Sequence, residues 1–396
     1  MTTLTHAIPY GRQNITDDDI AAVTEALKSD YLTTGPRVDA FEEKFAEYIG
    51  ARYAVAVANG TAALHLCALA LDVQPGTRVI TTPITFAASA NCVRYCGGEV
   101  WFADIDPETL TLDLERVRQL IESRPKGFFH GLVPVDFAGY PVDLEAFRAL
   151  ADEHGLWIIE DACHAPGGWF TDSKGEEQWC GNGNYADLAI FSFHPVKHIA
   201  SGEGGMITTN DKALYERLKI LRTHGITRDR GNLRYPDHGG WYMEMQQLGY
   251  NYRIPDILCA LGTSQLSRAE EGMQRRQEIA QRYDTAFSTD DFRTANIKKI
   301  HGVPSADRRH AFHLYVIEVA DRRGLYDFLR DHEIYAQVHY VPVHTMPYYQ
   351  DIGYEEADLT HSERYYSGGI SLPMYPTLTN EEQDFVIDRI KEFVRG

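Results

Sequence analysis

The chain has 396 residues, of which 44% are hydrophobic and 24% charged, and this ordinary globular composition excludes a disordered or fibrous protein. Its 57 acidic residues outnumber the 38 basic ones, and the formal net charge of −19 argues against a surface for nucleic acid or an anionic membrane. An anionic ligand would therefore have to be held by local donors such as helix N-termini.

The first two thirds of the chain alternate between short apolar segments and segments with helical periodicity. Thr16 is a suitable N-cap for a helix that reaches about Ser29. Strands are expected at 53–58, 78–82, 99–103, 128–136, 156–160, 187–193 and 206–209. This alternation predicts an α/β fold with a mostly parallel central sheet covered by helices on both faces.

The pattern changes after Pro255. A long polar helix is expected at 256–287, followed by a strand in HLYVIEV, a helix at 322–332, the segment YAQVHY and a final helix from about Asn380. We therefore predict two domains, a large one at 1–264 and a smaller C-terminal α/β domain at 265–396.

The six cysteines form no CxxC pair, so buried reduced thiols in a cytoplasmic protein are expected rather than zinc ligands or disulfides. The first residues show no signal-peptide pattern, and the most apolar stretch is interrupted by Asn59, Gly60 and His65, so no membrane span is expected. His339 and His344 have no third ligand nearby in the sequence. They are better interpreted as pocket or core histidines than as metal ligands.

Lys197 lies just beyond an apolar strand in FSFHPVKHIASGEGG, where an amine can lose water and its pKa can fall. Such an amine forms a Schiff base with a carbonyl, although a lone lysine in a loop is more often merely exposed. Glu160 and Asp161 end another apolar strand. A carboxylate there can hold the protonated nitrogen of a pyridinium ring, as pyridoxal 5′-phosphate (PLP) requires, or it can simply cap the next turn.

Two further segments fit the same cofactor. Asn59-Gly60-Thr61 stands between a strand and a helix, where free N–H groups can hold a phosphate, although such turns are common. Phe86 could lie flat on a cofactor ring, with plain core packing as the alternative. No Walker or dinucleotide-binding glycine pattern is present in these segments, which disfavours a kinase or a Rossmann dehydrogenase.

Taken together, NGTAAL, TTPITFAASAN, EDACHAPGG, FSFHPVKHIASGEGG, RTHGI and GYNYRIPDILCALGTSQL resemble the DegT family of nucleotide-sugar aminotransferases, in order along nearly the whole chain. The resemblance implies the type I (aspartate aminotransferase) fold, PLP as cofactor and a homodimer with shared active sites. It assigns cofactor attachment to Lys197 and the ring-nitrogen contact to Asp161. The further cofactor contacts that it implies are Gly60, Thr61, Phe86, His164, Ser192 and, from the neighbouring subunit, Asn251.

Within the family, the likeness is greatest to the aminotransferases of pseudaminic acid biosynthesis. It implies that L-glutamate donates an amino group to C4 of a UDP-linked 4-keto-6-deoxy-N-acetylhexosamine of the L-arabino series. The sugar-nucleotide contacts implied are Tyr10, Asp30, Tyr31, Leu32, Thr33, Gln337, Val338, His339 and Tyr340. The polar stretch 171–184 departs from the family pattern and is either a surface loop or a lid.

Three alternatives stay open at this point. The enzyme could aminate a different 4-keto sugar, as in perosamine or 4-amino-arabinose synthesis. A sugar dehydratase of the same family would carry histidine in place of Lys197, which argues against that activity. A non-catalytic regulator on the same fold is disfavoured because both Lys197 and Asp161 are present.

Overall fold

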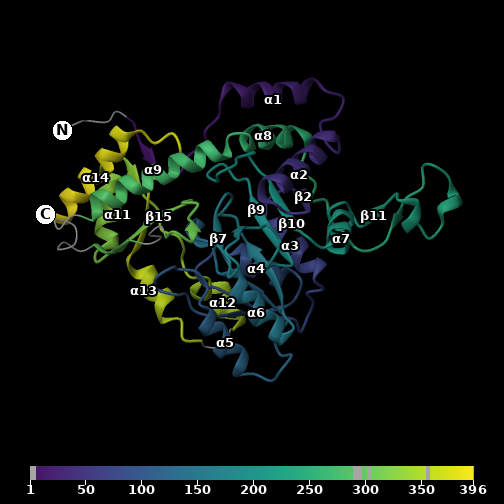
Figure 1. Ribbon diagram of the computed structural model, residues 1–396, viewed down its shortest axis with the longest axis horizontal. Coiled ribbons are helices and arrows are strands. Elements are labelled where there is room, and N and C mark those ends of the chain that lie inside the picture. The colour runs from purple at the N-terminus through teal and green to yellow at the C-terminus, as the bar shows by residue number, and fades with distance from the viewer. Residues whose placement is uncertain (1–5, 289–296, 301–304, 354–356, 396) are drawn as a thin grey trace.

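Seven of the apolar segments form one twisted sheet in the computed structural model, which describes residues 6–288, 297–300, 305–353 and 357–395 (Figure 1). Its strands are, in spatial order, β2 (Tyr53–Val57), β10 (Gly205–Thr209), β9 (Leu188–Ser192), β6 (Trp157–Asp161), β5 (Gly131–Val133), β3 (Arg78–Thr81) and β4 (Glu99–Phe102). β10 runs antiparallel to both of its neighbours, and all other neighbouring pairs are parallel. The predicted mostly parallel sheet is confirmed.

Side chains that alternate along the strands bury two apolar layers. In β2, Ala54 and Ala56 pack in one core cluster, whereas Val55 and Val57 pack in another. The helices packed on the first face are α2 (Pro36–Ile49), α5 (Leu114–Glu122), α6 (Leu144–His154) and α8 (Asp256–Leu266). Those on the second are α3 (Gly60–Ala70), α4 (Ala88–Tyr95) and α7 (Lys212–Arg222). Helices cover both faces, as predicted.

The first helix begins as the sequence predicts. α1 (Asp17–Lys28) follows Thr16, whose backbone amide donates a 2.9 Å hydrogen bond to the Asp19 carboxylate. That carboxylate also accepts hydrogen bonds from Ser264 and Gln265 of α8 and pairs with Arg268. The cap of α1 therefore also fixes α1 to α8.

The single long helix predicted at 256–287 is wrong. The chain turns at Ser267 and Arg268, so α8 ends at Leu266 and α9 spans Ala269–Phe287. The turn brings the Arg268 guanidinium to the buried Asp19 carboxylate, an ion pair that sequence periodicity cannot reveal.

The C-terminal elements form a second, smaller sheet with its own apolar core. The three-stranded antiparallel sheet has the order β13 (Ile297–Ile300), β15 (Tyr315–Val319) and β17 (Gly369–Leu372). The helices that pack with it are α11 (Arg322–Asp331), α13 (Thr360–Gly368), α14 (Asn380–Arg395) and the C-terminal half of α9. α12 (Pro347–Ile352) lies beside the larger sheet. Ile8 packs into this second core, because β1 (Ile8–Pro9) pairs with β16 (Ile334–Tyr335). The division into 1–264 and 265–396 stays a prediction.

In YAQVHY, which was expected to form an element of this part, only the first residue lies in a strand, at the end of β16. Gln337 then forms an isolated bridge with Ser371.

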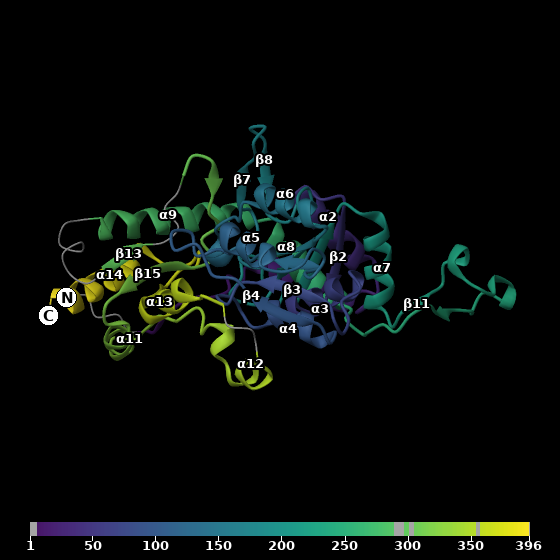
Figure 2. The same ribbon diagram turned by 90° about the horizontal axis from the view of Figure 1, so that it is seen from below.

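The polar stretch 171–184 forms most of a β-hairpin. β7 (Trp169–Thr171) and β8 (Glu177–Trp179) pair with each other, and β14 (Arg308–Arg309) pairs with β7. The hairpin points outward from the body of the molecule in Figure 2.

Residues 223–250 form an arm that projects away from the sheet in both views (Figures 1 and 2). It holds the short pair β11 (Ile226–Thr227) and β12 (Glu244–Met245). Trp241 is 81% exposed and Leu248 is 74% exposed on this arm. Large apolar side chains therefore face solvent on a segment with little core of its own.

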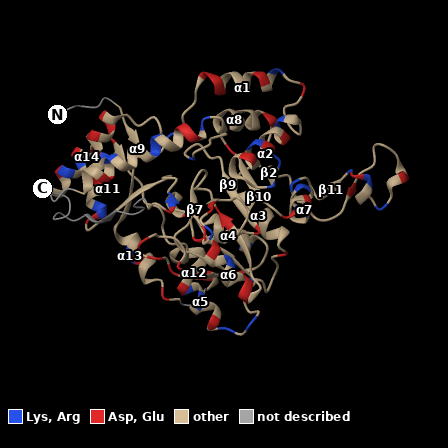
Figure 3. Cartoon of the chain, viewed as in Figure 1, with Lys and Arg blue, Asp and Glu red and all other residues tan. Residues whose placement is uncertain are grey.

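Acidic and basic residues are scattered over the outer helices and the arm in the view of Figure 3. Within the described residues, no helix is both long enough and apolar enough to cross a bilayer.

Candidate functional site

A cavity of about 690 Å³ opens where parallel strands end. Asp161 is the last residue of β6 and Ser192 is the last residue of β9, and both side chains line the cavity. The carboxyl edge of a parallel sheet is the usual place for a ligand in an open α/β fold. The predicted site residues that line the cavity are Tyr10, Gly60, Thr61, Phe86, Asp161, His164, Ser192, Lys197, His339 and Tyr340.

Lys197 follows β9 in a turn and directs its amine at the cavity. Burial lowers the pKa of this amine, while the nearby Cys163 and Asp161 act in the opposite direction. Nζ lies 3.4 Å from Nε2 of His313. A buried amine with a lowered pKa is a competent nucleophile toward a carbonyl carbon and a competent proton carrier.

Asp161 is held in one orientation by two donors. The Ser89 hydroxyl donates to Oδ2 at 2.6 Å, and the Cys163 backbone amide donates to Oδ1 at 3.2 Å. Only 5% of the residue is exposed. A carboxylate so placed can accept a further hydrogen bond from a protonated ring nitrogen in the cavity.

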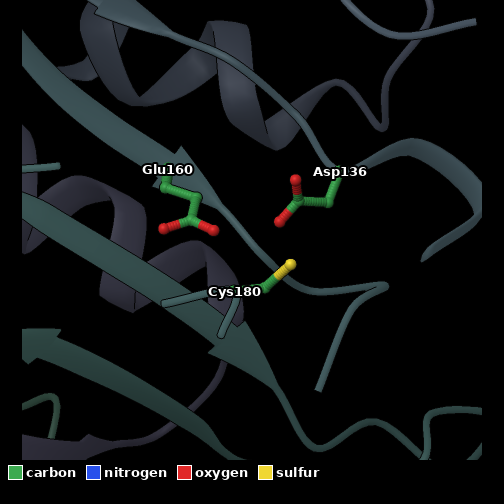
Figure 4. Close-up of side chains that lie close together, drawn as sticks. All are labelled: Asp136, Glu160 and Cys180. Carbon is green, nitrogen blue, oxygen red and sulfur yellow. The ribbon is translucent and has the colours of Figure 1, made fainter. Parts of the chain in front are cut away.

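Glu160, the other acid of this strand end, does not line the cavity. It lies with Asp136 and Cys180 in a buried cluster (Figure 4). Both Glu160 oxygens accept from the Gly181 amide, at 2.9 and 3.0 Å. Burial raises the pKa of both carboxyls. The charge of Asp136 and its hydrogen bond raise the pKa of Glu160 further, whereas the same hydrogen bond acts to lower the pKa of Asp136. The two acids of the motif thus have different surroundings.

The turn before α3 forms a cradle of backbone. Asn59 caps the helix by accepting from the Ala62 amide at 2.8 Å, while the Gly60 and Thr61 amides have no hydrogen-bond partner in the described part of the chain. A Cβ on Gly205 would come within 2.6 Å of the Asn59 backbone. The close approach and the free amides at a helix N-terminus suit a phosphate group.

An exposed aromatic ring stands at one side of the cavity. Phe86 is 62% exposed, although its neighbours are largely buried, so its face is free for a planar ring. His164 accepts from the Ala138 amide through Nδ1 and lies 3.1 Å from the Tyr340 hydroxyl through Nε2. Burial keeps the pKa of His164 well below its usual range, so this imidazole is neutral. Together with Asp161 and Lys197, these groups fit PLP.

Other predicted residues lie elsewhere. Asp30, Tyr31, Leu32 and Thr33 are exposed and do not line the cavity, and neither do Gln337 and Val338. Asn251, expected to act on a neighbouring subunit, is exposed at the base of the arm and is also outside this cavity. No residue of 171–184 lines the cavity.

Among the cavity residues that were not predicted, Ser89 and His313 contact the side chains of Asp161 and Lys197 respectively. Ser89 stands in TFAASAN, where the available signal was a hydroxyl among small residues at the start of a helix. His313 begins HLYVIEV, which was interpreted only as a strand. More than a hundred residues separate it from Lys197 in the sequence, so no local pattern indicates their contact.

The model of the DegT/DnrJ/EryC1/StrS aminotransferase family matches residues 13–391. The spore coat polysaccharide biosynthesis protein SpsC of Bacillus subtilis is 38% identical, over 99% of this chain and 98% of its own length. A UDP-4-amino-4,6-dideoxy-N-acetyl-beta-L-altrosamine transaminase of Campylobacter jejuni is 35% identical, over 97% of this chain and 96% of its own. A putative sugar aminotransferase of Streptococcus pneumoniae, solved in its PMP-form, has a TM-score of 0.88 at 26% identity, covering 98% of this chain and 99% of that one.

The backbone cradle generates a first prediction. Gly205→Ala should weaken PLP binding by about tenfold or more, because the added methyl group must displace the Asn59–Gly60 backbone. Titration of the cofactor-free protein with PLP, followed by absorbance, measures the effect. Gly272→Ala is the matched control, since a Cβ there meets only Pro376 at 3.7 Å. Equal affinity in the two variants would contradict the role of the cradle.

Proposed function

Because this chain belongs to the DegT/DnrJ/EryC1/StrS aminotransferase family and is a PLP-dependent sugar aminotransferase, we propose that it transfers the amino group of L-glutamate to C4 of a UDP-linked 4-keto-6-deoxy-N-acetylhexosamine. The sugar would be of the L-arabino series, and its product would serve pseudaminic acid biosynthesis. One observation supports the proposal. Lys197 and Asp161 line the same cavity, and the N-terminus of α3, with its free backbone amides, forms another wall of that cavity.

Each residue has a distinct task in this reaction. Bound PLP supplies an electron sink for the bonds at the reacting carbon. Lys197 Nζ would attach the cofactor, would take the proton from Cα of the amino donor and would later deliver a proton to the sugar carbon. Asp161, held by Ser89 and Cys163, would keep a proton on the ring nitrogen. Gly60, Thr61 and Ser192 would hold the phosphate, and Phe86 and His164 would flank the ring.

For the sugar nucleotide, we propose contacts from Tyr10, His339 and Tyr340. The rings of Tyr10 and His339 lie 5.1 Å apart at the cavity. His339 Nδ1 lies 2.9 Å from the Ser371 hydroxyl, and the His339 carbonyl accepts from Tyr365 at 2.6 Å, so Ser371 holds the ring and Tyr365 holds the backbone. A pocket of fixed polar groups rejects sugars that leave those groups unpaired.

We also propose a homodimer in which the arm packs on a second copy of the chain. Trp241, Met245 and Leu248 expose apolar surface there, which a partner would cover. Asn251 follows the arm directly and would reach the partner's cofactor. A twofold symmetric pair is the commonest assembly of identical chains.

Attachment of the cofactor is tested on Lys197. Borohydride reduction of the PLP-loaded protein, followed by peptide mass spectrometry, should place the cofactor on this residue. Lys197→Ala should lose transamination by several orders of magnitude, because the variant lacks the amine that moves the proton. The exposed Lys212 offers a control: Lys212→Ala should keep full activity. A label on a different lysine would overturn the assignment.

Substrate choice is tested with a panel of 4-keto nucleotide sugars. His339→Ala should slow the half-reaction with the sugar by about ten- to a hundredfold and leave the half-reaction with glutamate nearly unchanged, since one polar contact of the pocket is lost. His344→Asn, a buried histidine of the same segment outside the cavity, is the control. A wide preference for a GDP- or dTDP-linked sugar, or for the 4-keto-arabinose type, would overturn the proposed substrate.

Shared sites are tested by mixing two inactive variants. In a mixed dimer of Lys197→Ala and Asn251→Ala chains, one site carries both changes and the other carries neither. Activity should therefore return to a fraction of the wild-type value after subunit exchange. An inactive mixture, with exchange verified by native mass spectrometry and with a severe defect in Asn251→Ala alone, would contradict sharing.

A further inference from the structure

Four histidines lie close enough to Lys197 to interact with its charge, and they are His164, His198, His313 and His339. A fifth, the buried His310, lies near His198. Burial lowers the pKa of every one of them, so all five imidazoles are neutral near neutral pH. A neutral imidazole has one nitrogen that donates and one that accepts, and its neighbours decide which is which.

Backbone groups fix this choice for three of the five. His164 and His310 each accept an amide hydrogen through Nδ1, from Ala138 and Phe312 respectively. His198 Nε2 lies 2.8 Å from the Ala311 carbonyl and must donate to it. These three rings cannot exchange the roles of their nitrogens without losing a buried hydrogen bond.

His313 is different. Its Nε2 lies 3.4 Å from Nζ of Lys197, and its Nδ1 is buried with no hydrogen-bond partner among the described residues. No backbone group therefore determines which of its nitrogens carries the hydrogen. The backbone of His313 is nonetheless held, because the buried Arg276 guanidinium donates to the carbonyls of Phe312, His313 and Met374.

We propose that His313 is the residue that positions Lys197. Its neutral imidazole hydrogen bonds to Nζ of Lys197 both when Nζ is an ammonium group and when Nζ is a free amine. With the hydrogen on Nδ1, Nε2 accepts from the ammonium form. With the hydrogen on Nε2, the ring donates to the free amine. The inference rests on the proposed role of Lys197 as the reacting amine, and it gives that amine a constant direction into the cavity while its proton comes and goes.

The two hydrogen bonds are not equally strong. A bond from an ammonium group is charge-assisted and is about twice as strong as one between neutral partners. His313 should therefore stabilise the protonated amine more than the free one and raise the pKa of Lys197 relative to a site without the imidazole. This effect opposes the lowering by burial and by Arg276, and it acts in the same direction as Cys163 and Asp161.

The remaining groups that face this pair come from several elements. Around His313 they are Lys197, His164, His198 and Arg276, and around Lys197 they are Cys163, Asp161, Arg276, His164, His198 and His339. None of these groups is substituted in the variants below, so a change in the pKa of Lys197 reports on His313.

The test measures the pKa of Lys197 in the full-length chain freed of cofactor. Competitive acetylation with limiting acetic anhydride over a series of pH values, read by peptide mass spectrometry, gives the titration midpoint of Nζ. Lys212, whose side chain is 73% exposed, is the internal reference on the same chain. Circular dichroism and thermal unfolding establish that each variant is folded.

Four variants separate a hydrogen bond from simple packing. His313→Phe keeps a flat ring and has no nitrogen, and His313→Asn ends near the place of Nδ1 and does not reach Nζ. Both should lower the midpoint by about one pH unit, a tenfold change in the protonation equilibrium. His313→Gln places an amide oxygen near the position of Nε2 and should restore the wild-type midpoint. His310→Asn, a change at a buried histidine of the same segment, should leave the midpoint unchanged.

A wild-type midpoint in both His313→Phe and His313→Asn would overturn the proposal. An equal shift in His313→Gln and in the two loss variants would also overturn it, because shape rather than a hydrogen bond would then control the amine. The measurement uses neither cofactor nor sugar. A borohydride label on another lysine would sink the proposed function and would leave this result on the His313–Lys197 contact standing.

Discussion

The site depends on keeping one lysine amine away from water and still able to gain and lose a proton. Burial alone would hold Lys197 in its neutral form, and a close carboxylate alone would hold it as an ammonium. The chain balances the two effects, because Asp161 and Cys163 act against the cost of burial and Arg276 acts with it. The neighbouring histidines can take part in this balance without adding charge, since burial keeps them neutral.

The topology of the large sheet places this amine. β6 and β9 run parallel and end at the same edge, which brings Asp161 and Ser192 together. β10 runs the other way, so it begins where its neighbours end, and Gly205 pairs with both Val57 and Ser192. One reversed strand therefore brings the start of α3 and the loop of Lys197 to one place. A parallel strand at that position would begin at the opposite edge.

Short-range patterns predicted the strands of the large sheet and the residues at their ends, because alternation and strand-end polar residues are local properties. Lys197, Asp161 and Gly60 could be proposed as site residues for the same reason. The break at Ser267 and the contact of His313 with Lys197 depend on side chains far apart in sequence, and no local pattern records them. The arm failed to stand out for a related reason, since its exposed apolar residues look like core residues until the fold leaves them uncovered.

The polar stretch 171–184 has a structural explanation in the second acid of the EDAC motif. Neighbouring residues of a strand point to opposite faces, so placing Asp161 at the cavity obliges Glu160 to enter the protein interior. A buried carboxylate without partners is costly. The hairpin leads into Gly181, whose amide binds both Glu160 oxygens, and Cys180 and Asp136 complete the surroundings (Figure 4). With its proton affinity raised there, the Glu160–Asp136 pair can retain a proton and avoid carrying two buried charges beside Asp161. The extra residues thus follow from the strand that supplies Asp161, and their length needs no contact with the substrate.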